Sequence, residues 1–164
     1  MSDTAPSFEE FQQRVKGTNI CEQTLLATDY LNHINEPIML LEMVADVPEL
    51  LEELAEWQPK TYAEHFRDSS FTDKDLAIEA YEWSPDRYRL RFEQTINSAN
   101  QCIATAIEAL GKLIEQERLD DVRILCTEVS TLLGDLVDRA GSIIHGNVDR
   151  SAQTQIDQIM DEAG

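Results

Sequence analysis

The sequence has few basic residues, and this shortage argues against several classes of partner. Lys and Arg together number 13 among 164 residues, against 32 Asp and Glu, so the formal net charge is −19 at pH 7. A surface with this charge repels nucleic-acid phosphates and anionic lipid headgroups. We therefore expect no nucleic-acid partner and no membrane partner. The hydrophobic content of 42% is nevertheless too high for a disordered acidic chain.

Long apolar runs and paired cysteines are also missing. No run approaches the roughly 20 apolar residues that a membrane-spanning helix needs, and the first residues have no basic or apolar segment typical of a secretory signal. The cysteines at positions 21, 102 and 126 are odd in number and far apart, as is typical of reduced structural thiols. These features predict a cytoplasmic protein.

Motifs for catalysis and metal binding are sparse. The six glycines are not clustered, so a phosphate-binding loop is absent, and there is no Gly-x-Ser-x-Gly. Asp29 with His33, and His65 with Asp68, lie at helical spacing and could share a metal ion. Such pairs arise by chance in so acidic a chain, and the Glu-x-x-His motif of di-metal bundles is absent. We expect no metal and no cofactor, and an enzyme is less favoured than a binding protein.

Capping residues divide the first half of the chain into short helices. Ser7 with Glu10 forms a capping box, Asp46 with Glu49 is expected to form another, and Thr61 to Glu64 open a further short helix. Because proline lacks an N–H and clashes with the preceding turn, Pro37 should kink or restart the helix. The expected helices cover residues 8–16, 20–33, 38–44, 47–57, 62–67 and 73–83. Asp46 is the expected cap of the helix over 47–57.

The second half carries the clearest pattern in the sequence, two apolar stripes with alternating spacings of four and three. The stripes consist of Phe92, Ile96, Ala99, Ile103, Ala106, Leu110 and Leu113, then Val122, Cys126, Val129, Leu133, Leu136, Ala140 and Ile143. Two such stripes joined by a short polar turn at 117–121 predict an antiparallel helical hairpin. Flanking apolar residues widen both stripes, so the hairpin should pack against the N-terminal helices or pair with a second copy as a homodimer.

The predicted fold is therefore all-α, a long antiparallel helical hairpin packed against several short N-terminal helices. The helical domain spans residues 1–146, with the short helices in 7–83 and the hairpin in 85–146. Residues 147–164 form a linker and a C-terminal amphipathic peptide. Eight of the 11 aromatic residues fall in the segment 57–92, and the sequence leaves open whether they form a core or a recognition groove.

The C-terminal peptide has the most informative motif. Ile156, Ile159 and Met160 lie at i, i+3 and i+4, which gives a helix one apolar face. Together with Gln153 and Asp157, they resemble the response-regulator-binding peptide of flagellar switch proteins, roughly Ser-Gln-x-Glu-Ile-Asp-x-Leu-Leu. The sequence departs from that pattern in having Ala for Ser, Gln for Glu, and Ile-Met for the two leucines. The resemblance implies a receiver-domain partner, and the alternative is that this helix packs on its own bundle.

A long hairpin followed by a linker and an acidic helix also resembles the chemotaxis phosphatase family. That family places a catalytic Gln on a hairpin helix, with an Asp one turn before it. Here the second arm contains no Gln, and Gln101 on the first arm follows Asn97 instead of Asp. The resemblance therefore supports partner binding more than phosphatase chemistry. We expect a non-enzymatic cytoplasmic signalling adaptor that uses its C-terminal helix. The alternatives are a phosphatase in which Gln101 orients water and a structural oligomer.

Overall fold

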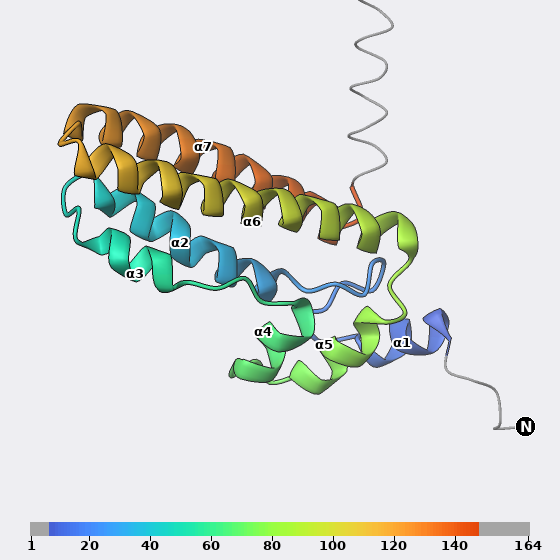
Figure 1. Ribbon diagram of the computed structural model, residues 1–164. Coiled ribbons are helices and arrows are strands. Elements are labelled where there is room, and N and C mark those ends of the chain that lie inside the picture. Colours follow the sequence, from blue (N-terminus) through green and yellow to red (C-terminus); the bar gives the residue numbers. More distant parts are fainter. Residues whose placement is uncertain (1–6, 148–164) are drawn as a thin grey trace, which may run out of the picture.

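The computed structural model describes residues 7–147, and within this range the chain is all-α (Figure 1). The described elements are α1 (Phe8–Arg14), the 3₁₀ helix η1 (Thr28–Tyr30), α2 (Leu31–Val44), α3 (Leu50–Glu56), α4 (Tyr62–Asp68), α5 (Lys74–Tyr81), α6 (Asp86–Glu115) and α7 (Leu119–Ile144). None of the described helices has the length and apolar character needed to cross a membrane. The predicted fold class is confirmed.

Helices α6 and α7 form the predicted antiparallel hairpin and dominate the molecule (Figure 1). The turn between them is tighter than expected, because Glu117 takes a left-handed φ of 58° and α7 begins at Leu119. All the stripe positions are buried except Leu113, which is half-buried. Helix α2 packs along α7, and α3 packs on α6. These two helices cover the apolar residues that the hairpin alone would leave exposed. The N-terminal helices therefore close the hairpin's core on one side.

The helix predicted over 20–33 is wrong for residues 20–27, because residues 15–27 form a loop that holds the end of α7; helical structure begins only at Thr28. The hydroxyl of buried Thr24 donates to the carbonyl of Ile144 over 2.5 Å, and Ser84 Oγ donates to the carbonyl of Thr24 over 2.6 Å. Leu25 is fully buried with a φ of 61°, and Ile20 pairs with Ala27 in a single β-bridge. Side-chain hydrogen bonds to the backbone compete with helix formation, and here they prevail.

The restart expected at Pro37, with a separate helix over 38–44, is also wrong. Pro37 lies inside the continuous helix α2 and has no N–H to donate to the carbonyl of His33, four residues earlier. That carbonyl instead accepts the indole N–H of Trp57, which follows α3, at 3.2 Å. The Trp57 ring also stacks on the His33 ring with centroids 4.7 Å apart. A side chain from the neighbouring helix thus replaces the hydrogen bond that proline removes.

The capping predictions were confirmed in part. Thr61 and Glu64 form the reciprocal capping box of α4, and Ser7 accepts the N–H of Glu10 at the start of α1. Asp46 does not cap α3, which begins only at Leu50. Asp46 instead accepts a 2.7 Å bond from Arg123 of α7. At the other end of the domain Gly146 has a φ of 81° and forms a left-handed cap after α7.

Candidate functional site

Of the residues that the sequence singled out for function, Gln101 falls within the described part of the chain. It lies near the middle of α6 with its side chain exposed, and Asn97, one turn earlier, is exposed as well. The partner-binding residues predicted from the C-terminal motif lie outside the described residues: Gln153, Ile156, Asp157, Ile159 and Met160.

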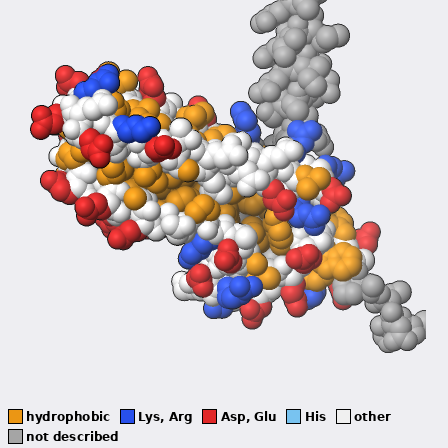
Figure 2. All heavy atoms as spheres, viewed as in Figure 1, with side chains coloured by type: hydrophobic (Ala, Val, Ile, Leu, Met, Phe, Trp, Pro, Cys, Tyr) orange, Lys and Arg blue, Asp and Glu red, His pale blue; other side chains and the backbone are white. Residues whose placement is uncertain are grey.

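Gln101 lines a shallow groove of about 360 Å³ on the outer side of the hairpin. The groove is formed by Ser98, Gln101, Cys102, Thr105, Ala106 and Ala109 of α6 with Leu125, Val129 and Leu132 of α7. No lining residue is charged, and α6 has no charged residue from Thr95 to Ile107. Figure 2 shows this change along the hairpin, where charged side chains crowd the ends of α6 and are missing from its middle.

The groove is suited to contact rather than to chemistry. It offers the amide of Gln101, two hydroxyls and one thiol, with no carboxylate or imidazole among its lining residues. General acid–base catalysis needs a titratable group within hydrogen-bond reach of the reacting atom. Burial raises the pKa of the Cys102 thiol, which disfavours the reactive thiolate. Cys126 is buried in the core and its thiol pKa is raised by burial in the same way.

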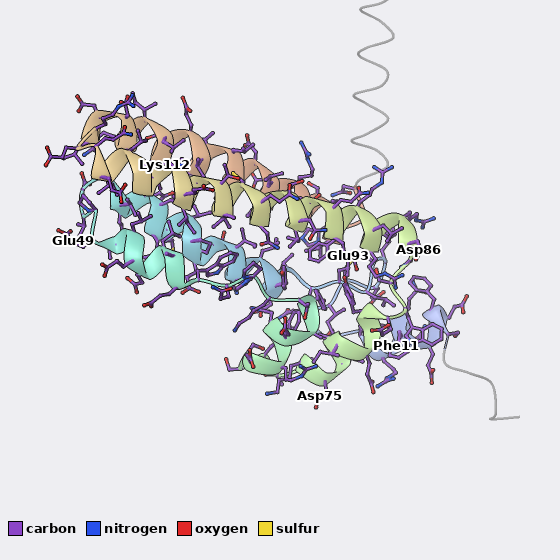
Figure 3. All side chains as sticks on the ribbon, in the orientation of Figure 1. Phe11, Glu49, Asp75, Asp86, Glu93 and Lys112 are labelled. Atoms are coloured by element: carbon purple, nitrogen blue, oxygen red, sulfur yellow. The ribbon has the colours of Figure 1, made fainter. Side chains whose placement is uncertain are left out.

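A second concave site lies between the α4–α5 pair and α6. It is a cleft of about 440 Å³ with four aromatic rings in its lining, those of Tyr30, Tyr62, Tyr81 and Phe92. The rings of Tyr62 and Tyr81 stack with centroids 4.3 Å apart. Figure 3 shows Glu93 on the side of α6 that faces α4 and α5. We call this space the aromatic cleft.

The polar groups of the aromatic cleft are mainly hydrogen-bond acceptors. Glu93 Oε1 accepts the hydroxyl of Tyr81, and burial, followed by this hydrogen bond, raises the pKa of Tyr81. Glu64 Oε1 accepts the backbone N–H of Thr61 at 2.8 Å, and this bond together with the Thr61 hydroxyl lowers the pKa of Glu64. Asn100 also lines the cleft, and its Oδ1 is buried without a hydrogen-bond partner. Tyr81 therefore stays protonated while Glu64 stays ionised.

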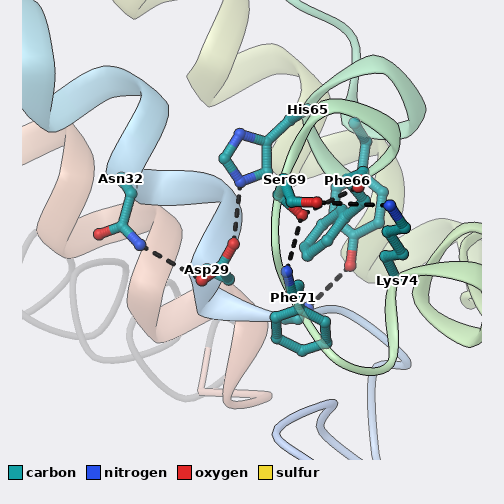
Figure 4. Close-up of polar contacts among 9 residues, drawn as sticks. Asp29, Asn32, His65, Phe66, Ser69, Phe71 and Lys74 are labelled. Carbon is teal, nitrogen blue, oxygen red and sulfur yellow. Dashed lines mark hydrogen bonds and ion pairs between the residues drawn. The ribbon is translucent and has the colours of Figure 1, made fainter.

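The histidines predicted as metal candidates take structural roles instead. His65 Nε2 lies 3.0 Å from Asp29 Oδ2, and Asn32 donates to the other oxygen of Asp29 at 3.3 Å (Figure 4). The suggested partner of His65, Asp68, pairs with Lys60 at 3.2 Å. Among residues 7–147, no group of three or more His, Cys, Asp and Glu side chains is arranged to hold a metal ion.

His33 is buried beside these residues and is kept neutral. Its Nε2 accepts the backbone N–H of Lys60 at 3.1 Å, which requires an unprotonated nitrogen. Burial lowers the pKa of His33 to about 4, and the nearby His65 and Lys60 act in the same direction. Tyr30, which packs against both histidines and donates to the carbonyl of Lys60, has its pKa raised to about 12, mainly by burial. These groups hold the 58–61 loop in place.

Most of the aromatic segment 57–92 is core. Tyr62, Phe66, Tyr88 and Phe92 are buried in the same cluster as the hairpin stripes. The half-buried rings include Tyr81, which borders the cleft, whereas Trp83 is 37% exposed. The segment therefore builds a core whose edge is the aromatic cleft.

Sequence reasoning missed the cleft itself. Its α6 side could have been noticed from Glu93, Asn97 and Asn100, which recur at i, i+4 and i+7 beside the apolar stripe. Its other side comes from Tyr81 on α5, and no spacing in the sequence relates that residue to α6.

No protein-family model matches the chain, and comparisons with curated proteins and with solved structures likewise found no match.

Proposed function

We propose that this protein is a non-enzymatic signalling adaptor that binds a protein partner through the apolar face of its C-terminal segment, Ile156, Ile159 and Met160. The partner proposed is a receiver domain of the chemotaxis type. The proposal rests on the motif in residues 153–160 and on the organisation of the domain that precedes it.

The observation that carries the proposal is that the described domain closes its core before the motif begins. The buried apolar cluster of the described residues runs from Phe11 to Ile144, and Gly146 ends α7 in a left-handed cap. The last carbonyls of α7 find partners within the described domain, because Ile144 accepts the hydroxyl of Thr24 and Ser142 accepts the N–H of Asn147. The helical domain thus needs no further segment to end its longest pair of helices, which supports a separate task for the motif.

The chemistry of the motif defines the partner surface. A short amphipathic helix binds by placing its apolar residues in a groove. Asp157, Asp161 and Glu162 and the net charge of −19 favour a groove with basic edges, and they speed its encounter. Three apolar side chains contribute at most a few kcal/mol after the cost of ordering the segment, so the dissociation constant should be micromolar or weaker.

Isothermal titration of the full chain into purified chemotaxis receiver domains, with and without beryllofluoride as a phosphoryl mimic, tests the proposal. Ile156→Asp should weaken binding at least tenfold, because a charge then enters an apolar groove. Thr154→Asp adds the same charge on the other side of the helix and should leave binding nearly unchanged. Equal binding by the two variants, or no binding by the full chain to any receiver domain, would contradict the proposal.

A homodimer through the hairpin is a second candidate, favoured by the uncharged groove between α6 and α7. Most of the surface of so acidic a chain repels a second copy, but the groove residues carry no charge, and Leu132 among them is 50% exposed. Sedimentation equilibrium should show self-association that Leu132→Asp abolishes. Ile124→Asp, at a 56% exposed position of α7 outside the groove, is the control. A monomer at the highest soluble concentration excludes this candidate.

A further inference from the structure

We propose that the aromatic cleft between α4, α5 and α6 binds a small organic cation, a protonated amine attached to an apolar body. This site is separate from the C-terminal motif and from the uncharged groove, so this proposal can be tested independently of the proposed function.

The size and walls of the cleft suit a small ligand. Its volume of about 440 Å³ lies within the range of small-molecule sites, roughly 300–1,000 Å³. The rings of Tyr30, Tyr62, Tyr81 and Phe92 line it together with Ile78 and Ile96. Aromatic rings attract cations through their negative faces and also provide apolar contact.

The charge of the lining selects a cation. Glu64, Glu82 and Glu93 bring three carboxylates to the cleft, and the one cationic side chain in its lining, Lys60, forms an ion pair with Asp68. Both Glu64 and Glu93 are engaged through Oε1, by Thr61 and Tyr81 respectively. Their Oε2 atoms keep acceptor capacity for an incoming ammonium. An anion would be repelled by these three carboxylates.

An unpaired acceptor distinguishes the cleft from an ordinary surface hollow. Asn100 Oδ1 is one of two buried side-chain polar atoms in the described chain that lack a hydrogen-bond partner. A buried acceptor without a partner is costly to the fold, and a ligand N–H would satisfy it once the Asn100 side chain, which lines the cleft, turns this covered oxygen toward the ligand. A purely apolar ligand would leave this oxygen unpaired and would offer no donor to the free carboxylate oxygens of Glu64 and Glu93. The lining therefore calls for hydrogen-bond donors, positive charge and apolar surface in one molecule.

The test is an NMR titration of the full ¹⁵N-labelled chain with phenethylammonium chloride. Two analogues of similar shape, the neutral 2-phenylethanol and the anionic 3-phenylpropionate, serve as controls. We expect a dissociation constant in the millimolar range for the ammonium, as is usual for a ligand of about nine non-hydrogen atoms. The side-chain amide of Asn100 should shift, and binding of the alcohol and of the carboxylate should be at least fivefold weaker.

Glu93→Gln keeps an acceptor for Tyr81 and removes the charge. It should lower the affinity for phenethylammonium about fivefold, which is the effect of losing one partly exposed ion pair. Glu82→Gln changes an exposed residue of the cleft and leaves the core intact. It should also lower the affinity for phenethylammonium. Glu115→Gln, at the far end of α6, is the control with the same chemical change. Equal affinity for ammonium and alcohol, or equal binding by all three variants, would overturn the proposal.

Discussion

Replacing Trp57 with Phe tests how α2 accommodates a proline in its interior. Phe keeps a ring against His33, where Trp57 now stacks at 4.7 Å, but it lacks the indole N–H that reaches the His33 carbonyl at 3.2 Å. Because Pro37 has no N–H, that carbonyl loses the partner that replaces its helical bond. The variant should therefore be less stable than the parent.

The size of the loss follows from the environment of the carbonyl. A buried acceptor left unsatisfied costs about 1–3 kcal/mol. Trp57 is only half-buried, so water can replace part of the bond and the lower end of that range applies. We expect about 1 kcal/mol, which for a protein of this size lowers the thermal midpoint by roughly 2–4 °C.

A double-mutant cycle separates this bond from other effects of the substitution. Pro37→Ala supplies an amide N–H to the His33 carbonyl, so in that background Trp57→Phe should cost about 1 kcal/mol less. The free energies come from urea unfolding followed by far-UV circular dichroism, because Trp57 itself contributes to fluorescence. If Trp57→Phe costs the same in the parent chain and in the Pro37→Ala background, the indole is not a substitute for the missing helical bond.

Other substitutions test separate features of the fold and the site. His33 has its pKa lowered to about 4 from an ordinary 6.5, so the unfolded chain binds the extra proton between these values and stability falls as pH drops through that window. Between pH 7 and pH 4.5 the free energy of unfolding should therefore fall by about 2 kcal/mol less in His33→Gln than in the parent, as measured by urea unfolding. Asn100→Leu should raise stability by about 1 kcal/mol in thermal melts, since it removes an unpaired buried acceptor, and a loss would mean that the oxygen has a partner. Thr61→Ala should cost about 1 kcal/mol by removing a formed capping box, whereas Asp73→Ala should change little because Asp73 makes no cap bond. Gln101→Ala should leave the rate of phosphoryl loss from a receiver domain unchanged, and a slower rate would restore the phosphatase alternative.

The hairpin could be predicted because the spacing of its apolar residues indicates which face of each helix is buried. An apolar residue at every third or fourth position identifies the buried face of a helix without knowledge of what covers it. The start of α4 was similarly local, since Thr61 and Glu64, the partners of its capping box, lie within one helical turn. The cap at Gly146 obeys the same kind of local rule, since glycine is free to adopt a positive φ after a helix.

The errors arose where distant residues decide the local structure. The 15–27 loop is held by Thr24 on Ile144 and by Tyr62 on Ala27, contacts that no window of sequence contains. Pro37 lies inside a continuous helix, and the His33 carbonyl that it leaves without a helical partner accepts the indole of Trp57 from outside that helix. The aromatic cleft was missed for the same reason, because Tyr81 and Glu93 belong to different helices.

The most direct test of the adaptor proposal compares the full chain with a chain ending at Asn147. Both are melted by differential scanning calorimetry and titrated with the receiver domain that the full chain binds. The account predicts thermal midpoints within about 1 °C of each other, with binding lost only from the shortened chain, because the core of the described domain closes at Ile144. A midpoint several degrees lower would assign the last residues to the bundle and contradict the account.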